Sequence, residues 1–428
     1  MKRSFGVLVI GAGPAGLAAA HAAAAHGVSV GMADDNPQAG GQIWRGGPAR
    51  QADARARDLW HTLANAPNVT LLHQCRVVCP LEGKRLLAQT PAGPIELAYG
   101  KLIIATGARE LLLPFPGWTL PGVTGAGGMQ ALAKGGFPVA GKRVIVAGSG
   151  PLLLAAAATL KQQGAHIAAI IEQAAWPRLA RFALGLLATP SKVTQALQLA
   201  CRLRDVPYLR DSYVLSAHGG DTLRSVMLQR RGRTEQWDCD LLACGYGLLP
   251  NVELALALGC AVENDGMAPD GDGMAPPAVR VDAWQRTSVA DVLCAGEGTG
   301  VGGVDLALAE GRIAGLAAAG HTQAMPALFA ERARWRQFAA RLARAFAPRP
   351  ELARLACDDT IVCRCEDVRH AELREHTSWR GAKLHTRCGM GPCQGRVCGG
   401  ATGLLYGWRP DAVRVPLSPT RIESFVEE

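Results

Sequence analysis

Near its start the chain carries the stretch Phe5-Gly-Val-Leu-Val-Ile-Gly-Ala-Gly-Pro-Ala-Gly16. The apolar first half predicts a buried parallel strand, and the glycines predict a tight turn into an Ala-rich helix that runs to about His26. Residues 28–33 form the next predicted strand, and Asp34 closes it, 23 residues after Gly11. Strand, glycine turn, helix, strand and acid in this order are the dinucleotide-binding fingerprint in its structural context.

Each residue of this unit has a physical role. Gly11 permits the tight turn, Gly13 lets a pyrophosphate approach the backbone, and Gly16 lets helix and strand pack closely. The amino end of the helix faces the phosphates, and Asp34 is expected to bind ribose hydroxyls. A purely structural glycine turn is the alternative. The predicted contacts with the ADP half of a cofactor are Gly11, Gly13, Pro14, Ala15, Gly16, Asp34 and Asp35.

The same unit recurs 137 residues later. Residues 144–147 form a predicted strand, Gly148-Ser-Gly150 forms the turn, and Glu172 stands 24 residues after Gly148. Leu153 occupies the place of the third small residue, where its side chain would crowd both the phosphate turn and the helix–strand contact. We therefore predict an α/β chain with two Rossmann-type domains, the second without a nucleotide; NAD(P)H binding there is the alternative.

Three further segments fit a flavin site in the first unit. Gly40-Gly41-Gln42 follows the acid, residues 101–107 form a strand ending in Ala-Thr-Gly, and residues 291–298 form a strand ending in Ala-Gly-Glu-Gly. These motifs resemble the glutathione-reductase-like flavoproteins with two dinucleotide-binding domains. In that family the late motif carries aspartate, which lies on the ribityl chain, whereas this chain has a glutamate. The resemblance implies FAD contacts at Gly41, Gln42, Ala105, Thr106, Gly107, Gly296 and Glu297.

Composition and charge exclude several classes of function. The net charge of +9 comes mostly from scattered arginines without a basic run, so no nucleic-acid binding is expected. No stretch of about 18 residues is uninterruptedly apolar, which leaves at most a peripheral membrane association. Residues 1–25 look like a secretion signal, but the glycine fingerprint explains them better. Residues 40–47 carry no cysteine and the middle of the chain has no C-x-x-C pair, so disulfide-reductase chemistry is not expected.

Five of the 13 cysteines gather near the C-terminal end as Cys363-Arg-Cys365, Cys388, Cys393 and Cys398. Structural zinc sites use C-x2–4-C pairs, so C-x-C is tight for zinc. It suits two thiolates on one iron of a [2Fe–2S] cluster, which takes four cysteines. Zinc and free thiols are the alternatives. An odd, clustered set of cysteines also indicates a reducing cytoplasm, with the inner face of the cell membrane as a peripheral location.

A wider set of motifs covers nearly the whole chain. Gly40-Gly-Gln, segment 109–123, segment 244–254 and segment 389–398 occur in one order. This order resembles the A (alpha) subunits of opine oxidases, the B subunit of hydrogen cyanide synthase and the alpha subunits of D-hydroxyproline or proline dehydrogenases. Their C-terminal domain resembles bacterioferritin-associated ferredoxin, with the ligand pattern C-x-C then C-x4-C. The resemblance implies the cluster ligands Cys363, Cys365, Cys393 and Cys398, with Cys388 left over.

The resemblance implies one subunit of a multisubunit amine or amino-acid dehydrogenase of D-hydroxyproline, proline or opine type. A separate flavoprotein (beta) subunit would oxidise the amine, and this chain would pass electrons through FAD and a [2Fe–2S] cluster to a quinone or another acceptor. FMN shared with a partner and a small ferredoxin-like subunit belong to the same expectation. We find no acid–base pair for substrate chemistry and assign no catalytic residue. The alternatives are a self-sufficient NAD(P)H-dependent reductase and a scaffold that binds ADP or ATP.

The expected domain organisation follows from the order of these motifs. A helical linker before the cysteines has an apolar face from Leu328 to Phe346 and a basic opposite face. The apolar face either packs on the body of the chain or forms part of a docking surface for a partner subunit. The predicted domains are a discontinuous FAD-binding domain (1–120 and 280–325), a second NAD(P)-binding-like domain (121–279), the linker (326–357) and a [2Fe–2S] domain (358–428).

Overall fold

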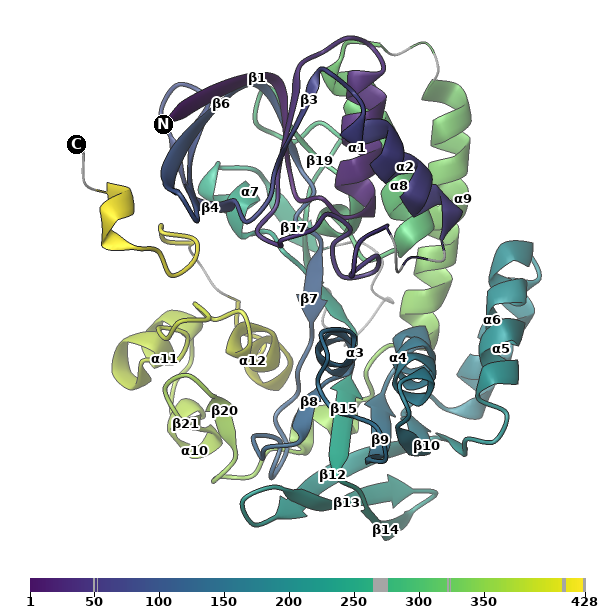
Figure 1. Ribbon diagram of the computed structural model, residues 1–428. Helices are drawn as coiled ribbons and strands as arrows, with labels where there is room; N and C mark the ends of the chain where they lie inside the picture. The colour runs from purple at the N-terminus through teal and green to yellow at the C-terminus, as the bar shows by residue number, and fades with distance from the viewer. Residues whose placement is uncertain are drawn as a thin grey trace.

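The computed structural model describes residues 1–48, 51, 53–264, 276–321, 323, 325–409 and 413–425. The first unit is built on a seven-stranded sheet of β1 (Lys2–Ile10), β2 (Val30–Ala33), β3 (Val69–Leu72), β4 (Arg76–Leu81), β5 (Arg85–Thr90), β6 (Gly93–Ile104) and β19 (Val292–Cys294). The strand order is β3-β2-β1-β6-β5-β4, with β19 paired to β6 (Figure 1).

The register of the parallel strands sets the position of the site. Ile10 lies beside Ala33 and Ile104, and Ile104 lies beside Cys294. Strands β1, β2, β6 and β19 therefore end together, and the loops after them share one edge of the sheet. In open α/β sheets ligands bind at this carboxyl edge.

Helices α1 (Pro14–Ala24), α2 (Ala54–Ala64) and α8 (Val304–Ala318) cover this sheet (Figure 1). Small residues let α1 and α8 approach closely, because a Cβ atom on Gly311 would lie 2.2 Å from the carbonyl oxygen of Ala15. Helix α1 ends two residues earlier than the sequence predicted. Its end is set by the turn at Gly27, whose φ of +75° favours glycine.

The first sheet is mixed, because β5 pairs antiparallel with both β4 and β6, whereas the sheet of the second unit is wholly parallel. The predicted α/β architecture with two Rossmann-type units is confirmed. The strand order of the second sheet is β11-β10-β9-β15-β8. The strands are β8 (Val123–Gly125), β9 (Arg143–Gly148), β10 (His166–Glu172), β11 (Tyr208–Arg210) and β15 (Leu241–Gly245). The helices of this unit are α3 (Ala126–Lys134), α4 (Pro151–Gln162), α5 (Trp176–Leu186) and α6 (Pro190–Arg202). An antiparallel ribbon of β12 (Ser212–Gly219), β13 (Leu223–Arg230) and β14 (Arg233–Asp238) lies at the outer end (Figure 1).

Short elements join the two units. Strands β7 (Ala108–Glu110) and β16 (Leu248–Pro250) pair antiparallel between them (Figure 1). The chain then returns to the first unit through α7 (Glu253–Ala257), the pair β17 (Val262–Asn264) and β18 (Pro277–Val279), and the 3-10 turn η2 (Gly296–Thr299).

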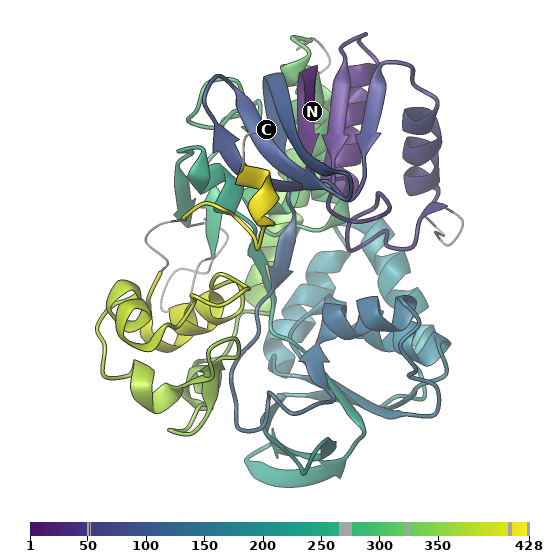
Figure 2. The same ribbon diagram turned by 60° about the vertical axis from the view of Figure 1, so that its left-hand side comes forward.

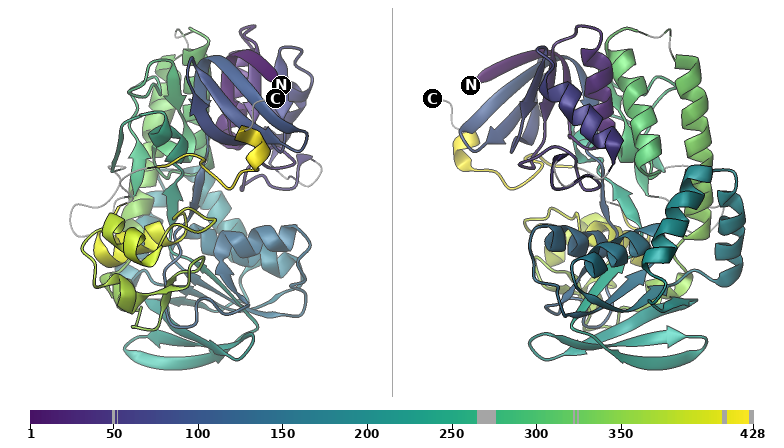
Figure 3. Two further views of the ribbon diagram at one scale, coloured as in Figure 1. Left: turned by 90° about the vertical axis from the view of Figure 1, so that its left-hand side faces the viewer. Right: turned by 45° about the vertical axis from the view of Figure 1, so that its right-hand side comes forward.

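Helix α9 (Met325–Ala345) runs along the first unit toward the second (Figure 3). The 3-10 turn η3 (Pro350–Arg354) leads into a small C-terminal unit of β20 (Ile361–Cys363), β21 (Val368–Arg369), α10 (His370–Leu373), α11 (Trp379–Thr386) and α12 (Cys398–Tyr406). The tail with η4 (Ile422–Phe425) then returns to the first sheet, where the Leu417 N–H donates to the Val78 carbonyl oxygen at 2.8 Å (Figure 2). Among the described helices, none is both long and apolar enough to cross a membrane.

Candidate functional site

The three glycines of the first glycine turn differ in how much space surrounds them. Gly11 has a φ of +104°, and a Cβ atom on Gly16 would lie 1.8 Å from the Gly11 carbonyl oxygen. Both positions are therefore fixed by packing. A Cβ atom on Gly13 would meet nothing closer than 3.9 Å, at the Cα of Gly41. Gly13 leaves room for a ligand at the amino end of α1, where the helix dipole favours phosphates.

The acid after β2 is held in a fixed orientation. One Asp34 oxygen accepts the Ala12 N–H at 2.6 Å, and the other accepts the main-chain and side-chain N–H groups of Asn36 at 2.8 and 2.7 Å. The carboxylate is buried, yet it lines the cavity described below. Asp35 lies on the same wall and pairs with Arg76 at 3.3 Å.

Two other predicted segments also line the cavity. The Thr106 hydroxyl donates to the Asn251 carbonyl oxygen at 2.8 Å, and the Asn251 amide donates back to the Thr106 carbonyl at 2.9 Å. These paired bonds fix the Ala-Thr-Gly turn against the loop after β16. In the other segment, the Gln42 side-chain oxygen accepts a hydrogen bond from Arg45 Nη2 at 2.7 Å.

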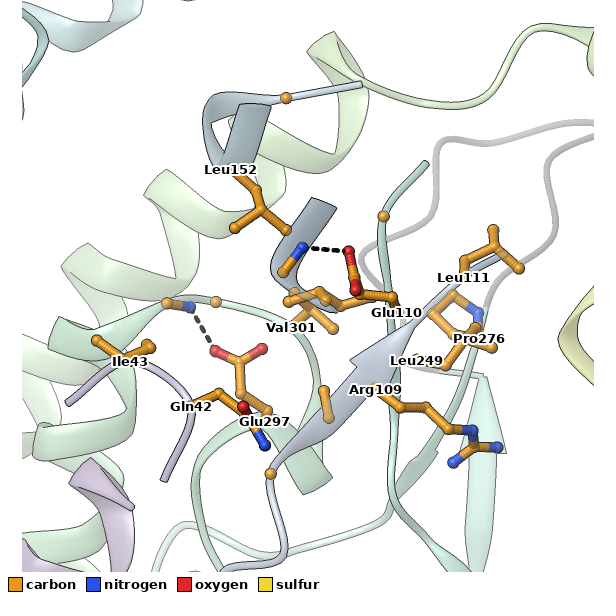
Figure 4. Close-up of a pocket in the computed structure, with 18 of the residues that line it drawn as sticks. Gln42, Ile43, Arg109, Glu110, Leu111, Leu152, Leu249, Pro276, Glu297 and Val301 are labelled. Atoms are coloured by element: carbon orange, nitrogen blue, oxygen red, sulfur yellow. Dashed lines mark hydrogen bonds between the residues drawn. The ribbon is translucent and has the colours of Figure 1, made fainter. Parts of the chain in front are cut away.

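Glu297 carries the feature that points most directly to a bound cofactor. One carboxyl oxygen accepts the Gly303 N–H at 2.8 Å (Figure 4), and the other is buried with no hydrogen-bond partner among the described residues. Burial raises the pKa of Glu297 to about 7. A buried oxygen without a donor is costly, so it fits a cofactor that supplies a hydroxyl, as the ribityl chain of FAD does.

These residues line one continuous cavity of about 2160 Å³. Ala15, Gly16 and Gly296 lie behind its wall, where they allow α1, β1 and α8 to pack. Gly302 and Gly303 also line it and were missed, although a glycine pair before a helix is a recognisable signal. The predicted residues on the wall are Gly11, Gly13, Pro14, Asp34, Asp35, Gly41, Gln42, Ala105, Thr106, Gly107 and Glu297.

The second glycine turn differs in the position of its acid. Glu172 is fully buried, accepts the Gly150 N–H at 2.8 Å and lies 3.3 Å from the Ser149 hydroxyl. Unlike Asp34, it does not line the cavity. Leu153 is also fully buried, within the helix–sheet contact of this unit.

The chain after α9 lies directly on this second turn. The Ser149 hydroxyl donates to the Phe346 carbonyl oxygen at 2.8 Å, and the Gln173 amide donates to the Ala347 carbonyl at 3.0 Å. The Arg349 N–H donates back to the Gln173 side-chain oxygen at 3.1 Å. Main chain of the linker thus lies on the end of β10, the end to which a dinucleotide directs its ribose.

Glu172 makes the free energy of unfolding of the chain depend on pH. Burial raises its pKa to about 7 from the ordinary 4.5. The stability it contributes is therefore complete below about pH 4.5 and is lost as pH rises through about 7, by up to about 3 kcal/mol. We expect Glu172→Gln to melt below the wild type, with a gap that narrows from pH 5 to pH 8. Thermal melts across this range measure the gap, and one that stays constant or widens contradicts the assignment.

All five C-terminal cysteines come together, including Cys388. The sulfurs of Cys363, Cys388 and Cys398 lie within 4.8 Å of one another and are buried. Cys365 and Cys393 form a neighbouring hydrogen-bonded pair nearer the surface. The sulfur-only donor set fits an iron–sulfur cluster, and it leaves Cys388 as a geometric competitor for one ligand position.

The surroundings of Cys363 favour a thiolate. Hydrogen bonds from the Cys388 and Cys398 thiols, with those from the main-chain N–H groups of Gly389 and Glu366, hold the pKa of Cys363 well below its usual range. Amides directed at sulfur stabilise negative charge, as a cluster with thiolate ligands requires.

The cysteine loop also reaches the cavity. Cys393 and Arg396 line it together with the first glycine turn. Arg396 is held by its own hydrogen bonds to the carbonyl oxygens of Cys393 at 3.4 Å and Leu417 at 2.6 Å. One cavity therefore extends from Gly13 to the cysteine loop.

The apolar face of α9 is covered by the chain itself. Trp335 and Phe338 are buried against Leu306 of α8, with Phe182 and Leu186 of α5 beside them. Of the two alternatives for this helix, the structure supports packing on the body, so this face is not free to dock a partner.

Comparisons with known proteins agree with this geometry. The family described as pyridine nucleotide-disulphide oxidoreductase matches residues 5–323. Hydrogen cyanide synthase subunit HcnB of Pseudomonas aeruginosa is 33% identical over 98% of this chain and 97% of its own. The A subunit of opine oxidase from Rhizobium meliloti is 33% identical over 92% of this chain and 90% of its own. The crystal structure of L-proline dehydrogenase from P. horikoshii has the same fold, with a TM-score of 0.71 at 18% identity over 100% of this chain and 80% of that one.

Proposed function

The chain belongs to the pyridine nucleotide-disulphide oxidoreductase family, in the group of HcnB and the A subunits of opine oxidases, and on this premise we propose that it is the electron-transfer subunit of a multisubunit amine or amino-acid dehydrogenase. The family makes it an FAD-dependent oxidoreductase subunit. The finer role, in which electrons pass from a partner flavoprotein through FAD and a [2Fe–2S] cluster to an acceptor, is our proposal.

The observation that carries this role is the shared cavity. Its wall includes Gly13, Asp34 and Glu297 at the flavin end and Cys393 at the cysteine end. A dinucleotide site and a thiol cluster that open into one cavity are arranged for electrons to move between them.

The proposed residue roles follow the contacts. Gly13 and the amino end of α1 would hold the pyrophosphate, Asp34 the ribose and Glu297 the ribityl chain. When bound, FAD supplies the ability to exchange electrons in pairs with one partner and singly with another. We keep the family's ligand set for the cluster, which is Cys363, Cys365, Cys393 and Cys398.

The electrons balance if the final acceptor takes up two electrons for each amine oxidised. On the partner flavoprotein, oxidation of a secondary amine to an imine releases two electrons and two protons. A [2Fe–2S] cluster held by the proposed cysteines would accept one electron at a time, so each amine would require two successive transfers. A quinone that takes up two electrons and two protons becomes a quinol and completes the balance. FMN shared with the partner and a small ferredoxin-like subunit fit the same route.

We also propose the functional division of the chain. The seven-stranded sheet supports an FAD-binding domain from 1–120 and 280–325, and the five-stranded sheet supports a second, nucleotide-free domain from 121–279. Helix α9 and the chain after it form the linker from 326–357. The cysteine unit, from 358–428, would be the [2Fe–2S] domain.

One anaerobic mixing experiment tests this role against the NAD(P)H-dependent alternative. We expect no bleaching of the flavin band with NADH, NADPH, D-hydroxyproline or proline, and full bleaching with dithionite. NADH and NADPH should not react because Glu172 is buried and linker main chain hydrogen-bonds to Ser149 and Gln173, where a dinucleotide would bind. The two amino acids should not react because the proposal places amine oxidation on the partner subunit. Rapid bleaching by NADH or NADPH would favour the reductase, and bleaching by an amine would place substrate oxidation on this chain.

A further inference from the structure

Arg109 joins the flavin end of the cavity to the cysteine loop. It lies two residues after Gly107 of the Ala-Thr-Gly turn, in β7 (Figure 4). Its Nε donates to the carbonyl oxygen of Arg396 at 3.0 Å, across 287 residues of sequence. Its Nη1 donates to the Pro250 carbonyl oxygen at 3.2 Å and to the Asn251 side-chain oxygen at 2.9 Å.

These contacts fix the guanidinium from both sides. Glu253 pairs with it at 2.9 Å, and the Arg109 side chain is only 24% exposed. Asn251 in turn holds the Thr106 turn, so the same network contacts the flavin wall and the cysteine loop. A planar guanidinium offers several donors in a fixed geometry, which a lysine at this position would not reproduce.

We propose that Arg109 is a positioning residue that holds the Cys393–Cys398 loop against the flavin cavity and thereby makes the Cys393 side of the thiol cluster the side that receives electrons. The proposal rests on the electron-transfer role proposed above. Electron-transfer rates fall steeply with distance, so a loop that loses its anchor receives electrons more slowly. In the proposed step one electron would pass from bound, reduced flavin to a cluster held by the cysteines, and no bond would form or break.

The variants must distinguish the effect of the Arg109 positive charge from its effect on the position of the cysteine loop. Arg109→Gln removes both the positive charge and the planar set of guanidinium donors, whereas Arg109→Lys keeps the positive charge and loses the planar set of donors. Arg364→Gln is the matched control, because Arg364 lies between Cys363 and Cys365 but directs its guanidinium over the Trp118 ring at 5.3 Å. It removes the same charge beside the cluster without touching the loop.

Two measurements on the full chain carry the test. Hydrogen exchange of the main-chain amides of residues 393–398 reports how tightly the loop is held without needing electron transfer. The rate at which the cluster is reduced after photoreduction of the flavin measures electron transfer from the flavin to the cluster. For Arg109→Gln we expect about tenfold faster exchange, because the Arg396 carbonyl oxygen loses its donor, and about tenfold slower transfer, because the released loop lies on average farther from the flavin. Arg109→Lys should be intermediate in both, and Arg364→Gln should match the wild type in both.

Each other outcome overturns a defined claim. If the loop amides of Arg109→Gln exchange at the wild-type rate, Arg109 does not hold the loop. If they exchange faster but the cluster is reduced at an unchanged rate, electrons do not enter the cluster on the Cys393 side. If Arg364→Gln slows transfer as much as Arg109→Gln, charge and not position explains the effect. If the wild-type chain holds zinc, or the cluster is never reduced, the proposed electron-transfer function fails, while the exchange measurement still decides whether Arg109 anchors the loop.

Discussion

Gly13→Val is expected to yield a folded chain that purifies without flavin. Gly13 has a φ of −76°, which any residue adopts, and its Cβ position is open to 3.9 Å, so the backbone tolerates a side chain. The valine would fill the space at the amino end of α1 into which a pyrophosphate must fit. We expect flavin occupancy below about a tenth of the wild-type value, equivalent to at least about 1.4 kcal/mol of binding.

Two other glycines make the comparison specific. Gly220 lies in the turn between β12 and β13 with nothing within 4 Å of its Cβ position, so Gly220→Val should keep both fold and flavin. Gly16→Ala would put a methyl group 1.8 Å from the Gly11 carbonyl oxygen and should lower the melting temperature as well as flavin content. Full flavin in purified Gly13→Val would contradict the cofactor assignment.

Removal of a cluster ligand should have an equally large effect. Cys363→Ala, Cys365→Ala, Cys393→Ala and Cys398→Ala are each expected to lose the paramagnetic signal of the reduced cluster or to alter it strongly, because a [2Fe–2S] cluster needs four thiolates. Iron analysis and low-temperature electron paramagnetic resonance measure the loss.

Cys388 is the informative control, because its sulfur lies within 4.8 Å of the sulfurs of both Cys363 and Cys398. The ligand set we propose requires that Cys388→Ala retain about two irons per chain. If this variant loses iron while Cys393→Ala or Cys398→Ala keeps it, Cys388 is a ligand and the proposed set is wrong.

Much of the cavity wall that we propose for the flavin could be predicted because its determinants are local. The turn at Gly11, the open position at Gly13 and the acid at Asp34 lie within one strand–helix–strand unit, so spacing alone orders them. Glu297 lies far along the chain, but the strand before it has a recognisable ending. The role of Gly27 in ending α1 could also be predicted from the sequence, and its left-handed backbone confirms it, although the last helical residue is Ala24 and not His26.

The remaining features depend on contacts that no local pattern reveals. The bond from Ser149 to Phe346 spans 197 residues, and the bond from Arg109 to Arg396 spans 287. Each joins a side chain to a main-chain carbonyl, so the identity of the accepting residue leaves no trace in the sequence. Cys388 shows the same limit, since the family's ligand pattern leaves it out while folding brings its sulfur beside Cys363.

The most direct test of the account is photoreduction of the purified chain under argon, with the flavin followed by absorbance and the cluster by low-temperature electron paramagnetic resonance. We predict that the chain contains FAD and about two irons, and that the signal of a reduced [2Fe–2S] cluster appears as electrons leave the reduced flavin. A chain that contains one zinc and no iron, or a cluster that stays oxidised beside a fully reduced flavin, would contradict the electron-transfer role.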